Sequence, residues 1–252
     1  MNVPPAPRLS VVIAAYNERG TIEEVLWRVQ RVGIDKELIV VDDGSTDGTR
    51  ELLQMIADGI ASGLEATTLP KTGHRLPIKN IAICLQPGNR GKGAALRRGF
   101  QTARGRIVII QDADLEYDPQ EYLQLVDPIE RDVADVVYGS RFLGGPHRVL
   151  FYRHSLGNKL LTHISNLFTD LNLTDVWTCY KAFRREVLQG LDLREDRFGF
   201  EPEVTAKIAR MGCRVYEVPI SYSGRTYEEG KKIGWKDAVS GLRCVLRYNI
   251  FG

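Results

Sequence analysis

Short apolar runs and helix-like apolar spacings alternate along the first 140 residues of the chain. Leu9–Ala15, Glu37–Val41, Ile81–Leu85 and Ile107–Ile110 are nearly continuous apolar runs, which predict strands buried on both faces of a sheet. Between these runs, apolar residues recur every three or four positions, as they do on one face of a helix. With a fifth strand at Asp135–Tyr138, this order predicts an α/β fold with a mostly parallel, Rossmann-like sheet flanked by helices.

The alternation of strand-like and helix-like segments is less regular after residue 140, and also over residues 59–79. Helices are predicted at His154–Phe168, whose apolar residues share one side, over the segment that ends at Met211, and from Trp235 onward. Cys213–Tyr222 reads as extended chain. Residues 59–79 are polar and rich in Gly and Pro, so we expect a long loop there, which in a compact domain is often functional or mobile.

Three acidic residues follow the strand at 107–110. Asp112, Asp114 and Glu116 would lie at the carboxyl end of a buried parallel strand, where open α/β sheets bind ligands. Their oxygens can be presented together to one hard cation such as Mg²⁺ or Mn²⁺. The alternative is that these acids cap the next helix and face water; Asp118, before Pro119, fits that role.

Two other predicted strands also end in polar groups. Tyr16, Asn17 and Glu18 follow the first strand, and Asp42 and Asp43 follow the second. The carboxyl ends of parallel strands meet at one edge of a sheet, so this edge is where a nucleotide would bind. The dinucleotide fingerprint and the Walker loop are both missing from the sequence, which disfavours hydride transfer and P-loop hydrolysis.

Positive charge is concentrated in two segments. Residues 66–111 contain nine Lys or Arg and no acid, and residues 141–160 contain four and no acid. These segments suit a polyanionic ligand, although solvated basic faces are also common. Lys92 follows a glycine-bearing turn at the start of a predicted helix. The free backbone N–H groups there could bind an anion, or the turn could simply begin the helix.

The composition indicates an ordinary globular protein of 252 residues, with 43% hydrophobic and 26% charged residues and a net charge of +2. The four cysteines are far apart, which argues against a zinc site or a disulfide framework and fits a reducing cytoplasm. We expect no signal peptide, because the N-terminus has no apolar core, and no membrane span, because no run approaches ~20 apolar residues.

The last predicted helix has an apolar face. Trp235, Val239, Leu242 and Leu246 share it, while Arg243 and other basic residues lie off it. This face either packs on the domain's own core or lies in a bilayer interface. The second possibility predicts salt-sensitive binding to anionic membranes through this helix.

Eight motifs, in order, resemble the inverting family 2 glycosyltransferases of the GT-A fold, on the dolichol-phosphate mannose synthase-like branch. The resemblance extends over nearly the whole chain. The motifs are Ala15–Glu18, Val41–Thr49, Asn89–Gly93, Asp112–Leu115, Gly139–Phe142, Gly199–Glu201, Glu217–Ile220 and the basic tail from Arg225 to Lys232.

The resemblance implies a nucleotide-diphosphate sugar donor of the GDP-mannose or UDP-glucose type, bound with Mg²⁺ or Mn²⁺. Asp112 and Asp114 would hold the metal, and Glu116 stands where this branch often has a Gln ligand. A divalent cation would offset carboxylate–phosphate repulsion of about 4 kcal/mol per close pair. The matched substrate-binding positions are Ala15, Tyr16, Glu18, Asp42, Asp43, Lys92, Asp112, Ala113 and Lys232.

The resemblance also implies a polyprenyl phosphate acceptor, whose phosphate oxygen attacks the sugar. Because this acceptor is already anionic, the reaction needs a cluster of cations more than a strong base. Arg141, Arg225 and Lys231 match the positions for that cluster, and Asp114 completes the reacting centre. Asp175 stands where relatives with hydroxyl acceptors place a base, and it could equally be a turn cap.

We therefore expect one glycosyltransferase domain over residues 1–252: a nucleotide-sugar-binding half (1–140), an acceptor-side half (141–223) and a basic tail with an amphipathic helix (224–252). The protein would be cytoplasmic and peripheral at the inner face of the membrane. Two alternatives remain open: transfer to a sugar hydroxyl of a glycolipid or polysaccharide, and a catalytically silent nucleotide-sugar-binding module.

Overall fold

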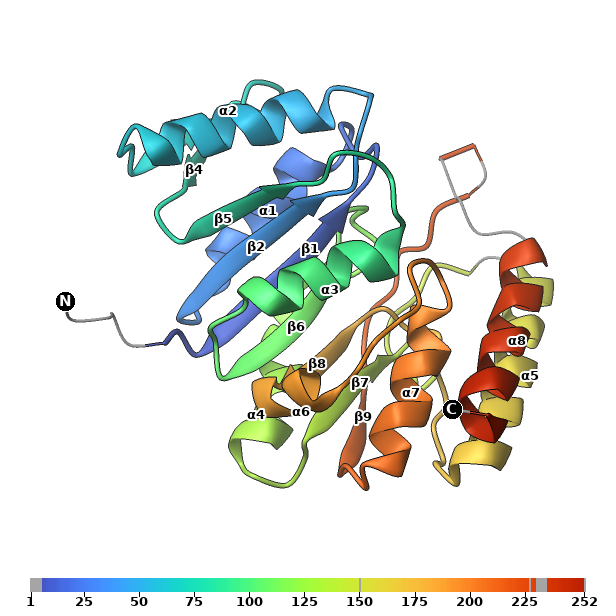
Figure 1. Cartoon of the computed structure of the whole chain (residues 1–252). Coiled ribbons are helices and arrows are strands. Elements are labelled where there is room, and N and C mark those ends of the chain that lie inside the picture. The colour runs from blue at the N-terminus through green and yellow to red at the C-terminus, as the bar shows by residue number, and fades with distance from the viewer. Residues whose placement is uncertain (1–5, 150, 227, 230–234, 252) are drawn as a thin grey trace.

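A seven-stranded sheet runs through the middle of the molecule, with helices on both of its faces (Figure 1). The computed structural model describes residues 6–149, 151–226, 228–229 and 235–251, without the side chains of 235–238. The strand order is β5-β2-β1-β6-β8-β7-β9. The strands are β1 (Leu9–Ala15), β2 (Lys36–Asp42), β5 (Ile81–Leu85), β6 (Ile107–Asp112), β7 (Val136–Ser140), β8 (Lys181–Arg184) and β9 (Val215–Pro219).

The register of the central strands explains why the acidic motifs meet. β1 is parallel to β2 on one side and to β6 on the other, with Ala15 beside Asp42 and Ala14 beside Asp112. Three strand ends therefore reach the same edge of the sheet. The predicted strands, the parallel core of the sheet and the α/β class are confirmed.

Strand β8 is the main departure from the predicted topology. It runs antiparallel between β6 and β7, so these two strands do not pair with each other. The sequence analysis did not identify Lys181–Arg184 as a strand, since it is short and has a charged residue at each end. Burial between two strands holds it in place: Ala182 and Phe183 are fully buried.

The long loop expected over residues 59–79 was a wrong prediction. Helix α2 continues to Ala61, and β3 (Ala66–Thr68) and β4 (Arg75–Pro77) then form an antiparallel pair. Leu69, Leu76 and Ile78 are fully buried, which anchors this small hairpin to the domain. Only a few of its residues are apolar, so periodicity alone did not reveal it.

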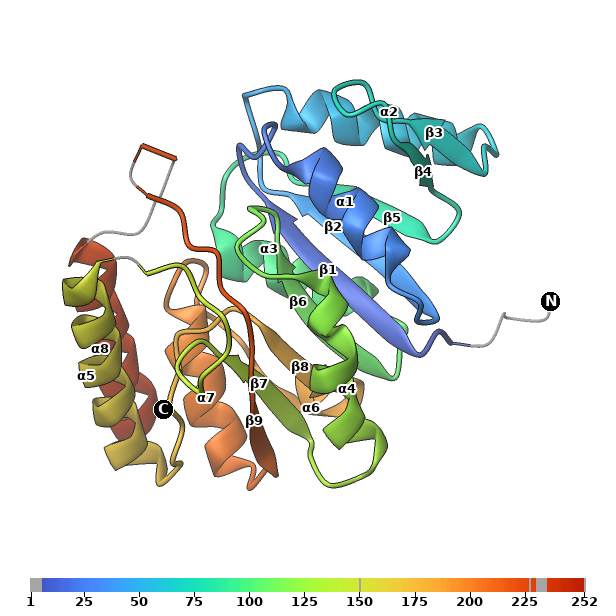
Figure 2. The same ribbon diagram turned by 180° about the vertical axis from the view of Figure 1, so that it is seen from behind.

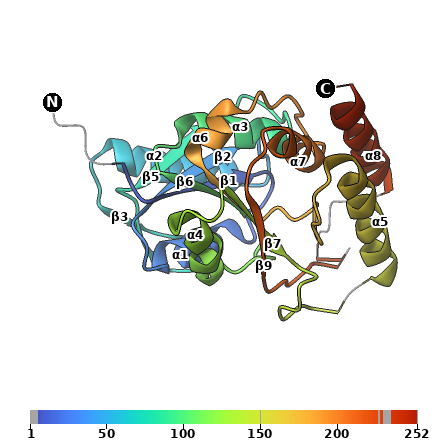
Figure 3. The ribbon, with the colours of Figure 1, turned by 90° about the horizontal axis from the view of Figure 1, so that it is seen from below.

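The helices divide into two layers and an outer pair (Figures 1 and 2). Helices α1, α2 and α4 share one apolar core with the sheet, and α3, α6 and α7 share the other. Helices α5 and α8 lie side by side beyond α7, at the end of the molecule away from α2 (Figure 3). The helices are α1 (Ile22–Arg31), α2 (Thr49–Ala61), α3 (Lys92–Thr102), α4 (Tyr122–Glu130), α5 (Tyr152–Thr169), α6 (Arg185–Gly190), α7 (Phe200–Arg210) and α8 (Trp235–Ile250), with a 3₁₀ turn at Pro119–Glu121.

Strands from both halves of the chain build one sheet. β8 and β9 come from the later part of the sequence, yet β8 pairs with β6 and β9 with β7. None of the helices in the described residues is both long enough and apolar enough to span a membrane.

Candidate active site

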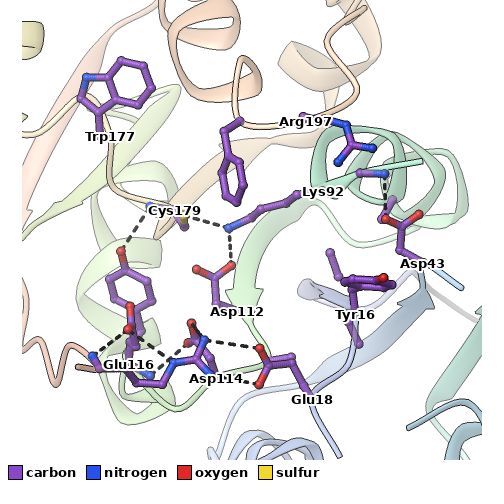
Figure 4. Close-up of a pocket in the computed structure, with 18 of the residues that line it drawn as sticks. Tyr16, Glu18, Asp43, Lys92, Asp112, Asp114, Glu116, Trp177, Cys179 and Arg197 are labelled. Atoms are coloured by element: carbon purple, nitrogen blue, oxygen red, sulfur yellow. Dashed lines mark hydrogen bonds and ion pairs between the residues drawn. The ribbon is translucent and has the colours of Figure 1, made fainter. Parts of the chain in front are cut away.

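A cleft of about 390 Å³ opens at the carboxyl ends of β1, β2 and β6 (Figure 4). This is the edge at which parallel α/β sheets bind ligands, and the volume suits a small molecule. Most of the predicted site residues line the cleft: Ala15, Tyr16, Glu18, Asp43, Lys92, Asp112, Ala113, Asp114, Glu116, Arg141 and Arg225. Asp42 and Asp175 do not line it, and Lys231 and Lys232 lie outside the described residues.

Four acidic side chains of the cleft interact with two basic residues, Lys92 and Arg225. The Arg225 guanidinium contacts Asp114 Oδ2 at 2.9 Å and Glu18 at 3.2 Å, and its backbone N–H donates to Glu116 at 2.9 Å. Lys92 Nζ lies 2.5 Å from Asp112 Oδ1. Positive side chains therefore offset part of the negative charge of the acidic wall in this structure.

Asp114 has the most perturbed carboxyl group of this wall. Burial, together with repulsion from Asp112 and Glu116, raises the pKa of Asp114 to about 7, although Arg225 opposes the rise. An additional positive charge near these three carboxylates would relieve that repulsion.

The donor set fits a divalent metal ion in chemistry but is not arranged as a metal site. Three carboxylates facing one cleft supply the oxygen ligands that Mg²⁺ and Mn²⁺ prefer. Within the described residues, however, no group of three or more acidic, His or Cys side chains is gathered closely enough to hold an ion. Asp112 instead points to Lys92 (Figure 4), and Asp114 pairs with Arg225.

Asp42 and Asp43 have different environments despite being adjacent. Asp43 lines the cleft, and its carboxylate accepts from the backbone N–H groups of Arg90 and Gly91 at 2.8 and 2.7 Å. Burial raises the pKa of Asp43, and the charge of Asp42 adds to the rise. Asp42 is fully buried and pairs with Arg50 at 2.8 Å, so the expected contact between Asp42 and a ligand is not supported.

The start of α3 is covered by another loop. The Ala94 N–H donates to the carbonyl of Asp196 at 3.1 Å, and Glu195 passes so close to Gly93 that a β-carbon there has no room. One of the backbone N–H groups expected to bind an anion is therefore already hydrogen-bonded to a protein carbonyl. Lys92, the other part of that prediction, does face the cleft.

The opposite wall of the cleft carries Arg141. Its guanidinium makes two hydrogen bonds to Asp175, at 2.6 and 2.8 Å, and lies 5.1 Å from the centre of the Tyr222 ring. Asp175 is fully buried, and Asn158 also donates to it at 3.5 Å. Because both of its oxygens are engaged, Asp175 holds Arg141 in position and is poorly placed to accept a proton from a substrate.

Several lining residues were not assigned to the site by sequence analysis: Tyr117, Trp177, Arg197, Phe198 and Tyr222. Most of them lie in connections outside the predicted strand–helix pattern. Cys179, also in the lining, is 2.8 Å from Lys92 Nζ and 3.5 Å from Glu201. Nothing in the periodicity of the sequence signalled these residues.

Comparisons with known proteins show which family this chain resembles. The model of the family described as Glycosyl transferase family 2 matches residues 10–191. Polyprenol monophosphomannose synthase of Mycolicibacterium smegmatis is 30% identical over 239 residues, which cover 92% of this chain and 83% of the relative. Dolichol-phosphate mannosyltransferase of Pyrococcus furiosus is 29% identical over 246 residues, 95% of this chain but 63% of the relative. Undecaprenyl-phosphate mannosyltransferase of Micrococcus luteus is 29% identical over 237 residues, 90% of this chain and 88% of the relative.

Solved structures support the fold. Glucosyl-3-phosphoglycerate synthase from Mycobacterium tuberculosis, in complex with Mn²⁺, UDP and glucosyl-3-phosphoglycerate, superposes with a TM-score of 0.68 at 22% identity, over 96% of this chain and 80% of that chain. The same enzyme is also known with Mg²⁺ and UDP, at a TM-score of 0.67 and 22% identity over 96% of this chain and 79% of that one. The expected GT-A fold is confirmed. The chain belongs to glycosyl transferase family 2 and is a glycosyltransferase of the dolichol-phosphate mannose synthase-like branch.

Proposed function

We propose that this glycosyltransferase moves a hexose from a nucleotide-diphosphate sugar to a polyprenyl phosphate. The three relatives named above carry polyprenol, dolichol-phosphate or undecaprenyl-phosphate in their names. The observation that carries the proposal is the cleft itself, which sets an acidic wall opposite a fixed arginine. Such a site can bring two anions together, a sugar diphosphate and a phosphate acceptor.

The donor would lie over the ends of β1, β2 and β6. Tyr16 and Asp43 line the side of the cleft suited to the nucleoside, and Asp112 and Asp114 line the side suited to the diphosphate. Mg²⁺ or Mn²⁺ would be held by Asp112, Asp114 and Glu116, and when bound it would neutralise charge on the leaving diphosphate. Lys92 and Arg225, which now pair with these acids, would then be available to phosphate oxygens.

The acceptor would approach from the wall formed by Arg141 and Tyr222. Arg141 is locked by Asp175, so its guanidinium is oriented before any ligand arrives. An acceptor phosphate is already ionised and needs no proton removed, which is consistent with a buried and doubly paired Asp175. A hydroxyl acceptor would need a base in this wall.

Each of the three parts of the chain would then have its own role in the reaction. Residues 1–140 would bind the donor, residues 141–223 would shape the acceptor side, and residues 224–252 would close the site with Arg225, Lys231 and Lys232. Because polyprenyl phosphates reside in a bilayer, the enzyme would act in peripheral contact with the inner face of the cytoplasmic membrane.

A thermal-shift panel tests the donor assignment. GDP and UDP sugars are compared with and without Mn²⁺, and the true donor should stabilise the protein by about 3 kcal/mol at a hundredfold excess over its Kd. The stabilisation should need Mn²⁺ and should disappear in Asp114→Asn.

Transfer assays then separate the acceptors. Labelled sugar should pass to a polyprenyl phosphate and not to the matching polyprenol. Transfer to a sugar hydroxyl instead would favour the glycolipid or polysaccharide alternative. Donor binding without turnover on any acceptor would favour a silent binding module.

A further inference from the structure

Lys92 contacts two different side chains of the cleft at once. It is the first residue of α3, and its ammonium group donates to Asp112 Oδ1 at 2.5 Å and to Cys179 Sγ at 2.8 Å (Figure 4). Asp112 belongs to the acidic wall, whereas Cys179 lies in the connection that leads into β8. An ammonium group has three N–H donors, so these two contacts leave one donor for a ligand.

The thiol of Cys179 connects Lys92 to a buried carboxylate. Its sulfur accepts from Lys92, and its S–H donates to Glu201 Oε1 at 3.5 Å. Burial raises the pKa of Cys179 well above its usual value, and the charge of Asp112 adds to the rise, so the thiol keeps the proton that it donates. Glu201 is only 3% exposed and lies in the first turn of α7, where the helix dipole stabilises a negative charge.

The turn that carries Cys179 is held from several sides. The backbone N–H of Cys179 donates to the Tyr117 hydroxyl at 3.4 Å. Lys181 is fully buried and donates to the carbonyls of Val176, at 3.1 Å, and Thr178. The position of the sulfur is therefore fixed by contacts that do not involve Asp112.

This independence matters when Asp112 changes its partner. If Asp112 binds a metal ion, as the proposed function requires, Lys92 loses that contact, and its flexible four-carbon stem would regain rotamer freedom. The contact with Cys179 restricts this freedom. Because the thiol is neutral, it leaves the positive charge of Lys92 available to an anion, which a carboxylate at the same place would neutralise. Sulfur is also a weak acceptor, so it does not compete strongly with a phosphate oxygen.

We propose that Cys179, held by Glu201, is a positioning residue that keeps Lys92 aimed at the donor's diphosphate once Asp112 has turned to another partner. Cys179 acts through Lys92 and does not itself touch the reacting atoms. The inference rests on the proposed function, which places the diphosphate beside Asp112.

A double-mutant cycle on nucleotide affinity tests the proposal. The probes are UDP and GDP with Mn²⁺, measured by isothermal titration calorimetry. Cys179→Ala should weaken the nucleotide that binds the wild type by roughly five- to tenfold, the size of one lost hydrogen bond. In a Lys92→Met background, the same substitution should have no further effect. Cys179→Ser keeps one donor and one acceptor and should restore most of the affinity.

Two more variants complete the set. Glu201→Met removes the acceptor of the thiol at similar side-chain volume, and its effect should also disappear in the Lys92→Met background. The matched control is Cys213→Ala, which removes a half-buried thiol that does not line the cleft and should leave the affinity unchanged. Thermal unfolding of each variant without nucleotide shows that it is folded.

The outcomes separate this inference from the proposed function. An equal loss from Cys179→Ala in both backgrounds would show a merely structural role and overturn the inference, as would a wild type that binds neither nucleotide or a Cys179→Ser variant no better than Cys179→Ala. If the cycle shows the coupling with Lys92 but no polyprenyl phosphate is ever glycosylated, the positioning role stands and the proposed function fails.

Discussion

At the scale of single residues, the cleft places several carboxylates close together, and Lys92 and Arg225 offset only part of their charge. This arrangement has a cost in stability. The folded protein keeps a proton on Asp114 at pH values where the unfolded chain, with an ordinary pKa of 3.8, has lost it. Since the folded-state pKa is the higher one, ionisation of Asp114 makes the free energy of unfolding fall as pH rises toward about 7.

Asp114→Asn should therefore stabilise the metal-free protein while abolishing transfer. The difference in unfolding free energy between variant and wild type should grow by on the order of 2 kcal/mol between about pH 5 and pH 8. Urea denaturation in EDTA at the two pH values measures it. Saturating Mn²⁺ should reduce the difference by stabilising the wild type, and a difference that does not change with pH would show that Asp114 is not under electrostatic strain.

A double-mutant cycle distinguishes the two roles considered for Asp175. If it only orients Arg141, Asp175→Asn should lower kcat/KM about tenfold in the wild type and have no further effect in an Arg141→Ala background. A proton-accepting Asp175 would instead cost ~10²-fold in both backgrounds. The cycle uses one donor throughout and is run with each acceptor class, a polyprenyl phosphate and a sugar hydroxyl, because only the hydroxyl needs a base.

The sequence predicted the acids of the site better than the rest of its lining. Asp112 and Asp114 could be placed because a buried strand runs directly into them and parallel strands end at one edge. Trp177, Arg197 and Tyr222 could not be placed, because connections between elements bring them to the cleft and no periodicity fixes the path of a connection. Asp42 is buried and pairs with Arg50, whereas Asp43, the next residue, lines the cleft; the sequence alone did not separate these two adjacent acids.

At the scale of elements, apolar runs predicted the strands well, whereas β8 and the β3–β4 hairpin were missed. Both are short, and their burial comes from neighbours far away in the sequence. The helix at α5 was predicted within two residues at its start and one at its end, but amphipathic spacing says only that a helix has two sides. The surroundings decide which side faces in.

Close packing of α3 on β1 gives a stability prediction. A β-carbon at Gly99 would overlap the side chain of Val12, so Gly99→Ala should lower the unfolding free energy by about 1–3 kcal/mol. Gly157→Ala on α5, where nothing lies within 4 Å, is the matched control and should be neutral or stabilising by about 0.5–1 kcal/mol. Equal losses in the two variants would show that helix content, rather than this contact, sets the effect.

At the scale of the whole molecule, one sheet joins the two halves of the chain, so the acidic wall and the arginine wall of the cleft stand on the same sheet. The acidic wall comes from β1 and β6, and the arginine wall follows β7, which is linked to β6 through β8. Helices α5 and α8 pack on each other and on α7, at the end of the molecule away from α2 (Figure 3). Composition and periodicity predicted the sheet; the order of its strands required the three-dimensional structure.

The central claim is that Asp112 and Asp114 bind the donor's diphosphate through a divalent metal ion beside Arg141. A crystal structure with the stabilising nucleotide sugar and Mn²⁺ tests it most directly. The account predicts metal density within coordination distance of Asp112, Asp114 and the diphosphate, with Lys92 and Arg225 moved from these acids to phosphate oxygens. A bound nucleotide sugar with both acids still paired to Lys92 and Arg225 would contradict it.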